Sequence, residues 1–394
     1  MASRRISIEE RRARLGRRHF LARASAAKDF VELAGGLVGL HATDPATVFL
    51  AARARLRKGS HAEVERALYE ERSVLRMIGM RRTMFVLPLE LAAVVHASCT
   101  EGIASAQRRR YAKLIEQGGI AKNGAAWLDK AAAATMAALE ARGEAYGSEL
   151  SQDVPLLRTK LSFGSGTKWA GSTGMTTWVL FLLAAEGRIV RGRPRGAWTS
   201  SQWRWVPAAS WLPAPLPRLD EQEARDTLAR RWLTTYGPAT VTDLNWWSGW
   251  TLTQTRRALT AIGAVEVDLD GTPGFVMPDD IDVVESSPEP WAALLPALDS
   301  TVMGWKERSW YLGEHGPALF DRSGNAGPTV WWNGRIVGGW AAAKSGRVRF
   351  RLLEDVGAKA VEQVEAEAAR LEAWLGGVVV IPRFGTPLGR ELAA

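Results

Sequence analysis

The same sequence of secondary-structure elements, helices followed by two strands, recurs three times along the chain. This recurrence restricts the possible fold more than any single motif does. Each time, segments with helical periodicity are followed by two β-like runs joined by a short turn. Helices followed by a two-stranded hairpin are typical of a winged helix, a variant of the helix-turn-helix. We interpret the three occurrences as a diverged internal repeat. With 394 residues, 46% of them apolar and 24% charged, the composition excludes a disordered or fibrous chain.

The first repeat, which we assign to residues 1–110, carries local signals for the starts of its helices. Ser7 and Glu10 have the spacing of a capping box, in which each residue caps the other's backbone. Asp44 followed by Pro45 fits the cap and the first position of another helix. The runs SVLRMIGM and RRTMFVLP then predict the hairpin.

The other two repeats occupy residues 111–212 and 213–284. In the second, TTWVLFLLAAEGRIV predicts a helix that passes into a strand, and RGRPRGAWTSSQWRWVP predicts a basic wing with a returning strand. In the third, Thr242 is a plausible helix cap, and VEVDLDGTPGFVMP alternates as a hairpin does. The Pro-rich segment WLPAPLPRLD predicts a linker between these repeats.

The last region, residues 285–394, has a different character. Asn333-Gly334 between alternating apolar runs is a strong hairpin signal. A further strand, a long amphipathic helix and a final strand at 378–384 are expected after it. We expect a small, barrel-like domain of mixed helix and strand.

Positive charge is concentrated in the first repeat. Residues 1–110 hold 21 Lys and Arg against 11 Asp and Glu, a net charge of +10, whereas the rest of the chain has a net charge of −1. A basic winged helix favours contact with DNA, although single arginines are often only solvated helix faces. The candidate DNA-binding residues are Arg14, Arg17, Arg18, Arg53, Arg57, Lys58, Arg81, Arg82, Arg191, Arg193, Arg195 and Arg335.

Several classes of protein are disfavoured because their motifs are missing. The single cysteine, Cys99, allows neither a disulfide framework nor a cysteine-based zinc site, and the five histidines have no metal-ligand spacing. Nucleotide-binding glycine loops and the G-x-S-x-G motif are missing from the sequence. An apolar run long enough to span a membrane and a signal peptide are missing as well. We therefore expect a protein of the cytoplasm that uses no metal and no cofactor.

Five blocks of sequence, in order along nearly the whole chain, resemble one bacterial family. The blocks are GLVGLHATDPATVFLAARARL, RMIGMRRTMFVLP, YGPATVTDLNWWSGW, LLPALDSTVMGWKERSWYLG and GPTVWWNGRIVGGW. They resemble the winged-helix DNA-binding-domain-containing family, which includes DNA glycosylases that unhook interstrand crosslinks and remove bulky alkylpurines. The resemblance implies an α+β fold in which three tandem winged helices form a C shape closed by a β-barrel-like domain. It also implies a catalytic motif inside the concave cleft.

At the position of the family's Gln-apolar-Gln or Gln-apolar-Asp motif, this sequence has His41-Ala42-Thr43. Hydrolysis of an N7-alkylpurine needs a water at the sugar C1′ and stabilisation of the positive charge that develops on the sugar. By position, the resemblance implies that His41 orients this water and accepts its proton and that Thr43 adds a hydrogen bond. Asp44 either stabilises the sugar cation or caps a helix. The alternative for His41 is a buried imidazole that bonds a nearby carbonyl.

Two features near the C-terminus have two interpretations each. Asp299, Lys306 and Arg308 form either a charged site or a structural network beside aromatic residues. The hairpin with Arg335 at its tip either probes a DNA groove, with Trp331 or Trp332 wedged between bases, or packs its tryptophans across strands.

The sequence thus predicts a monofunctional DNA repair glycosylase that acts as a monomer, in the cytoplasm at the nucleoid, on alkylated or crosslinked double-stranded DNA. The alternative is a non-catalytic winged-helix protein, either a transcriptional regulator or a lesion binder. A glycosylase should keep His41 and Thr43 as an accessible pair facing the same basic cavity as Arg82. A regulator should bury His41 and favour a dimer.

Overall fold

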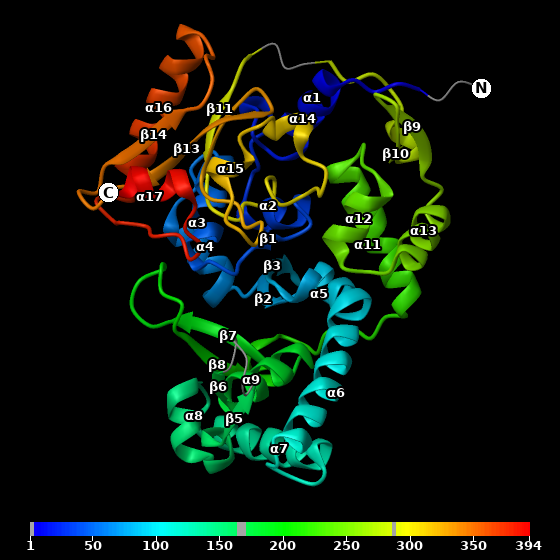
Figure 1. Cartoon of the computed structure of the whole chain (residues 1–394), viewed down its shortest axis with the longest axis vertical. Coiled ribbons are helices and arrows are strands. Elements are labelled where there is room, and N and C mark those ends of the chain that lie inside the picture. Colours follow the sequence, from blue (N-terminus) through cyan, green and yellow to red (C-terminus); the bar gives the residue numbers. More distant parts are fainter. Residues whose placement is uncertain (1–3, 164–170, 286–288) are drawn as a thin grey trace.

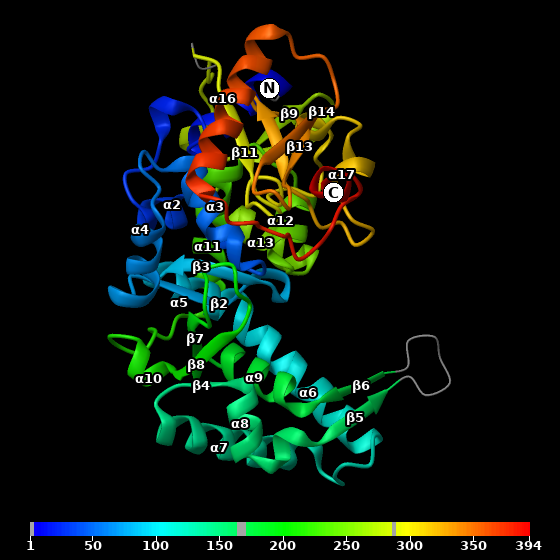
Figure 2. The same ribbon diagram turned by 90° about the vertical axis from the view of Figure 1, so that its left-hand side faces the viewer.

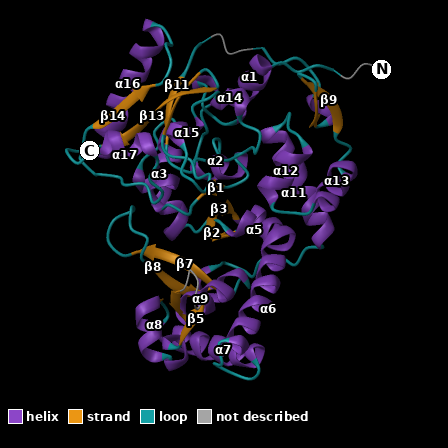
Figure 3. Cartoon of the chain, in the orientation of Figure 1, coloured by secondary structure: helices purple, strands orange, loops and turns teal. Residues whose placement is uncertain are grey.

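The computed structural model describes residues 4–163, 171–285 and 289–394. The chain forms a large upper body and a smaller lower lobe, joined by the long helix α6 (Glu101–Gln117) (Figure 1). Helices and antiparallel sheets both contribute to each part, so the expected mixed class is confirmed (Figure 3). Helix α6 runs through residue 110, where we had expected the boundary between the first two repeats. None of the helices in these described ranges is both long and apolar enough to cross a membrane.

The first unit consists of short helices and a three-stranded sheet of order β1-β3-β2. Its helices begin where local chemistry predicts, because Ser7 accepts a hydrogen bond from the Glu10 N–H and Asp44 accepts one from the Ala46 N–H. Its elements are α1 (Ile8–Arg18), α2 (Phe30–Gly36), β1 (Leu40–His41), α3 (Pro45–Arg55), α4 (His61–Glu65), β2 (Val74–Ile78) and β3 (Met84–Pro88), followed by α5 (Leu89–Val95).

The lower lobe is built from helices and two small sheets. The hairpin of β7 and β8 carries the expected basic wing, and β4 extends it to the order β4-β8-β7. A second hairpin, β5 with β6, projects from the lobe (Figure 2). The elements are α7 (Gly124–Arg142), β4 (Ala145–Tyr146), α8 (Gly147–Asp153), β5 (Lys160–Phe163), β6 (Gly171–Gly174), α9 (Met175–Ala185), β7 (Ile189–Pro194), β8 (Trp203–Pro207) and α10 (Ala208–Trp211).

The third unit repeats the order of helices followed by a hairpin. Its cap is Thr240 rather than Thr242, because the Thr240 hydroxyl and the Asp243 carboxylate bond each other's backbone N–H in a capping box. Its elements are α11 (Glu221–Tyr236), α12 (Val241–Ser248), α13 (Leu252–Ala261), β9 (Val265–Leu269) and β10 (Thr272–Val276).

The C-terminal region contains a four-stranded antiparallel sheet of order β11-β12-β13-β14. The Asn333-Gly334 turn joins β12 to β13, as its signal predicted. The strand expected at 378–384 is wrong, since these residues form no strand and 383–384 are a bend. The elements are β11 (Ala292–Leu295), α14 (Ser309–Leu312), α15 (Gly316–Leu319), β12 (Thr329–Trp332), β13 (Arg335–Ala342), β14 (Val348–Leu352), α16 (Ala358–Leu375) and α17 (Pro387–Ala393).

One hydrophobic core joins the first unit, the third unit and the C-terminal region into the upper body. Phe30, Phe85, Trp232 and Trp305 belong to this core, although they come from segments far apart in the sequence. Most of the lower lobe has separate cores, and the lobe packs on the upper body through β7 and α9 against β2. The upper body is therefore where side chains from several units can meet at one site.

Candidate functional site

The His41-Ala42-Thr43 motif begins at the short edge strand β1. His41 lies opposite Phe85 on β3, and the Ala42 N–H donates to the Met84 carbonyl at 2.7 Å. Ser300, from the C-terminal region, holds the strand on its other side. The Ser300 Oγ accepts a hydrogen bond from the His41 N–H at 3.0 Å and donates one to the Gly39 carbonyl at 3.0 Å.

A buried ion pair fixes the loop that carries Ser300. Asp299 accepts hydrogen bonds from two nitrogens of Arg55 at 2.6 and 2.9 Å, and both side chains are inaccessible to solvent. Arg55 also donates to the His19 carbonyl at 3.0 Å and to the Thr301 hydroxyl at 2.8 Å. Asp299 therefore belongs to a structural network, which is one of the two interpretations we gave it.

The His41 imidazole faces a small cavity. The cavity is lined by His41, Arg81, Phe85, Trp247, Ser300 and Met303, and it has room for about one water molecule. The ring is 4% exposed, and its Nδ1 is buried without a hydrogen-bond partner among the described residues. An imidazole that lines a space of this size can bind a water.

Burial makes His41 a weak base. Desolvation and the nearby Arg81 charge lower the pKa of His41 to about 3, because both disfavour the imidazolium. The ring is therefore neutral at physiological pH. It can hold a water by a hydrogen bond, but it is a poor acceptor of that water's proton, and this corrects the base role that we had expected.

Thr43 of the motif and the next residue, Asp44, differ in how fully their side chains are already hydrogen-bonded. The half-buried Thr43 accepts a hydrogen bond from the Met84 N–H at 3.3 Å, and its own hydroxyl hydrogen remains able to donate. Asp44 caps α3 through the Ala46 N–H at 3.1 Å and also accepts from the Arg383 N–H at 2.8 Å. Its side chain lines a different cavity from that of His41. Asp44 is thus a cap, as one of our interpretations held.

Sequence reasoning missed Arg76 of β2. Arg76 is buried and donates to the carbonyl of Ala42, the middle residue of the motif, at 3.1 Å. Its guanidinium lies over the ring of Trp203 on the wing, 4.2 Å from the centroid, and its charge acts on the nearby Tyr69 and Asp44. A charged residue within the otherwise apolar run VLRMI was the available signal.

Part of the predicted DNA-binding set lies on the surface. Arg17, Arg57, Lys58, Arg82 and Arg195 are exposed, so they are free to contact an anion. Arg193 is exposed but forms ion pairs with Glu65 at 3.2 Å and Glu70 at 3.0 Å.

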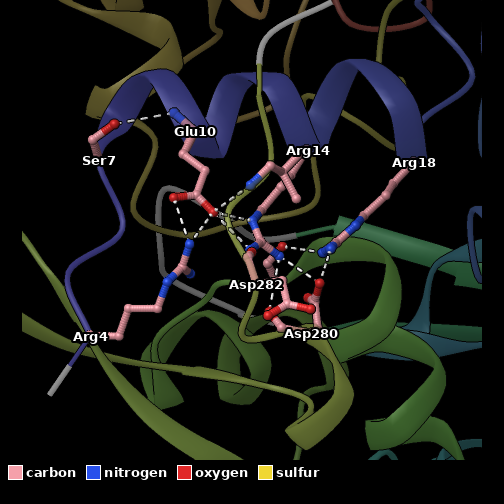
Figure 4. A network of polar contacts seen from close by, with 9 residues as sticks. Arg4, Ser7, Glu10, Arg14, Arg18, Asp280 and Asp282 are labelled. Carbon is pink, nitrogen blue, oxygen red and sulfur yellow. Dashed lines mark hydrogen bonds and ion pairs between the residues drawn. The ribbon is translucent and has the colours of Figure 1, made fainter.

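Other members of the set are held inside the protein. Figure 4 shows Arg14, 1% exposed, bound to Glu10 at 2.8 Å and to Asp280 at 2.6 Å, while Arg18 binds the same Asp280 carboxylate. Arg53 pairs with Glu367. Carboxylates of the chain thus already neutralise Arg14, Arg18 and Arg53, and Arg14 is buried, which disfavours the DNA contact that we had expected of these three.

The hairpin at Asn333-Gly334 is not free to probe a groove. Its turn packs on α1, where Gly334 lies against Arg12, and Asn333 bonds the backbone of Trp291. Arg335 pairs with Glu354 at 3.0 Å. Trp331 is fully buried, so the interpretation as cross-strand packing is the one the structure supports.

Two further arginines of the set are half-buried beside aromatic rings. Arg81 lies over Trp246, and Arg191 lies near Trp203 and Trp205. Burial lowers the pKa of each to about 10, so both remain charged at neutral pH. Arg81, not Arg82, lines the His41 cavity. The accessible pair of His41 and Thr43 facing Arg82, which we expected of a glycosylase, is therefore absent from the site.

No grouping of three or more His, Cys, Asp or Glu side chains suited to a metal ion occurs in the ranges that the structure describes. Cys99 is buried in the core, and burial raises the pKa of its thiol to about 11, in keeping with the inert role expected of it.

Comparison with known proteins gives a consistent result. A family model described as "DNA glycosylase AlkZ-like" matches residues 34–374. An interstrand DNA cross-link repair glycosylase of Streptomyces sahachiroi is 28% identical over 207 residues, which cover 49% of this chain and 54% of that protein. The chain thus spans about half the length of that curated relative. The solved structure of Streptomyces sahachiroi DNA glycosylase AlkZ aligns with a TM-score of 0.72 at 23% identity, over 96% of this chain and 99% of that one, which shows a shared fold.

Proposed function

Since the chain belongs to the AlkZ-like DNA glycosylase family, we propose that it hydrolyses the N-glycosidic bond of N7-alkylated purines in DNA, including bulky and crosslinked ones. The observation that carries the proposal is the cavity beside the motif. It offers one water-sized space lined by His41, whose buried Nδ1 has no hydrogen-bond partner among the described residues. A glycosylase of this kind needs a held water more than it needs an acid, because the alkylated base is already cationic.

The proposed reaction uses this water as the nucleophile. As the C1′–N9 bond breaks, the bonding electrons leave with the cationic base, which becomes a neutral alkylpurine. The water oxygen then bonds to C1′, and its proton passes to solvent rather than to His41, whose pKa of about 3 disfavours its protonation. His41 orients the water, and Thr43 donates a second hydrogen bond.

His41 ends the edge strand β1, and Thr43 follows it two positions along the chain, where it accepts a hydrogen bond from the Met84 N–H of β3. Ser300, which bonds the His41 N–H, and Arg76, which bonds the Ala42 carbonyl, hold this segment from opposite ends. This support is what a preorganised site requires. The substrate is proposed to be double-stranded DNA bound by a monomer, in the cytoplasm at the nucleoid.

One observation favours a second function. His41 is 4% exposed, as we expected of a non-catalytic DNA-binding protein. Burial to this extent would exclude direct contact with a bulky base, but it is compatible with contact to a single water. The two functions therefore differ in whether a water in the cavity reacts.

Base release separates them. The protein is incubated with duplex DNA that contains N7-methylguanine, with the same duplex undamaged, and with a duplex carrying a nitrogen-mustard-type crosslink. We expect free N7-methylguanine from the first, no base from the second, and separated strands from the third on a denaturing gel. Tight binding to all three without release or unhooking would support the non-catalytic function and overturn the glycosylase.

A further inference from the structure

Trp246 on α12 is contacted by two arginines from different parts of the chain. The guanidinium carbon of Arg81 lies 3.7 Å from the centre of the indole, and that of Arg308 lies 4.9 Å from it. Arg81 belongs to the turn between β2 and β3, which packs on α12, and Arg308 precedes α14. The first unit, the third unit and the C-terminal region therefore meet at this tryptophan.

Within the described ranges, neither of these guanidiniums forms an ion pair with a carboxylate. Arg308 uses its Nε for the Trp305 carbonyl at 2.9 Å, which leaves its terminal nitrogens. Burial and the charge of Arg308 lower the pKa of Arg81, and no carboxylate in the described part of the chain counters this effect. The half-buried Arg18 and Arg53, in contrast, are each neutralised by an acidic side chain. Two like charges held close together without an anion repel each other, and binding an anion would reverse this.

The backbone conformation at Arg81 is strained. Arg81 and Arg82 have φ angles of +53° and +61°, a left-handed region that side chains other than glycine seldom adopt. Gly249 lies opposite, and a Cβ there would stand 3.4 Å from Arg81, so the tryptophan helix ends in close contact with this turn. Strained residues that persist in this way are concentrated at functional sites.

Arg81 stands at the proposed site of hydrolysis, because it also lines the His41 cavity, and Arg308 is joined to it through the shared contact with Trp246. Stacking on an aromatic ring leaves the N–H edge of a guanidinium free, and this planar edge matches the oxygens of a phosphate. We propose that Arg81 and Arg308 together bind one backbone phosphate of the DNA strand, beside the nucleotide whose sugar faces His41. Trp246 is the platform that holds both guanidiniums. This inference rests on the proposed function in that it takes DNA as the ligand.

The salt dependence of DNA binding tests the shared phosphate. Binding of undamaged duplex DNA is measured over a range of salt concentrations for the wild type, Arg81→Gln, Arg308→Gln and the double variant. Removing the neutralisation of one phosphate lowers the slope of log K against log[salt] by about 0.9. Either single change should lower the slope by up to about one and weaken binding roughly tenfold. The double variant should lower the slope by no more than about 0.9, the value for a single phosphate, since the two arginines share one phosphate.

Two further sets of variants make the result specific. Arg349→Gln, on the exposed face of β14, is the matched control and should leave the slope unchanged. Arg81→Lys and Arg308→Lys keep the charge but lose the planar edge, so they should retain the slope while affinity falls. These conservative variants also keep the test valid if a glutamine variant fails to fold, which circular dichroism would reveal.

The outcomes also distinguish the phosphate site from the glycosylase. Unchanged slopes in the Arg81 and Arg308 variants, or a double variant whose slope falls by the amount expected for two phosphates, would overturn the shared site even if the wild type releases base. Reduced, non-additive slopes would support it even if the wild type releases none, since binding is measured on undamaged DNA.

Discussion

Acid should destabilise the upper body through His41, and the structure gives the size of this effect. In the unfolded chain, His41 has an ordinary pKa of about 6.5, whereas burial lowers the pKa of the folded residue to about 3. Between these two values the unfolded state binds one proton more than the folded state does, so stability rises with pH across this window. The contribution of His41 is complete above about pH 6.5 and is lost progressively as the pH falls toward 3.

Each pKa unit corresponds to 1.36 kcal/mol, so the full shift corresponds to roughly 5 kcal/mol. At about pH 4.5, two units below the unfolded pKa, His41 alone should remove about 3 kcal/mol of stability. The variant His41→Gln, which does not titrate in this range, should not show this loss. His19, also buried with a lowered pKa, is present in both proteins, so its contribution cancels in the comparison.

Urea unfolding at pH 7 and at about pH 4.5, followed by tryptophan fluorescence, measures the difference. The free energy of unfolding of the wild type should fall by about 3 kcal/mol more than that of His41→Gln between the two pH values. If both proteins lose the same amount, the folded His41 titrates at an ordinary pKa. In that case it is not the buried, neutral group on which the site depends.

Three other predictions follow from the same contacts. Asp299→Asn should lower the free energy of unfolding by about 3–5 kcal/mol because it leaves the Arg55 charge buried without a partner. The matched variant Asp153→Asn, in an exposed ion pair, should leave the melting temperature unchanged. Equal effects of the two variants on stability would contradict the role of burial. Ser300→Ala should slow base release about tenfold or more at unchanged DNA affinity, since it leaves the buried His41 N–H without an acceptor. An unchanged single-turnover rate of base release would show that this contact does not position the motif. Base release by the wild type should vary little between about pH 5 and pH 8, because His41 stays neutral throughout; a rate that falls below about pH 6.5 would indicate a histidine with an ordinary pKa.

Features that depend on neighbouring residues could be predicted from the sequence. The cap at Asp44 and the turn at Asn333-Gly334 occur where their local chemistry indicated, since both are set by a few consecutive residues. The order of helices and hairpins in the repeats was likewise visible in the hydrophobic periodicity. The strand expected at 378–384 did not form, because an apolar run alone does not supply a pairing partner; the Arg383 N–H instead donates to the Asp44 side chain.

Features that depend on distant contacts could not be predicted in this way. Arg14 and Arg17 lie on the same basic helix, yet Arg14 is buried against Asp280 and Arg17 is exposed, because the third unit covers only one side of α1. The bond from His41 to Ser300 joins residues 259 positions apart, so no local pattern reveals it. The burial of His41 also follows from the packing of these distant segments. For this reason the expected proton acceptor is instead a neutral group with a very low pKa.

The central claim is that a water held by His41 cleaves the glycosidic bond. Single-turnover release of N7-methylguanine from duplex DNA by His41→Ala, compared with the wild type and with His315→Ala as the matched histidine control, tests it most directly. We predict that His41→Ala slows release by at least about 100-fold, that His315→Ala releases base at the wild-type rate, and that all three proteins bind the duplex equally. A His41→Ala rate equal to that of the wild type would contradict the claim.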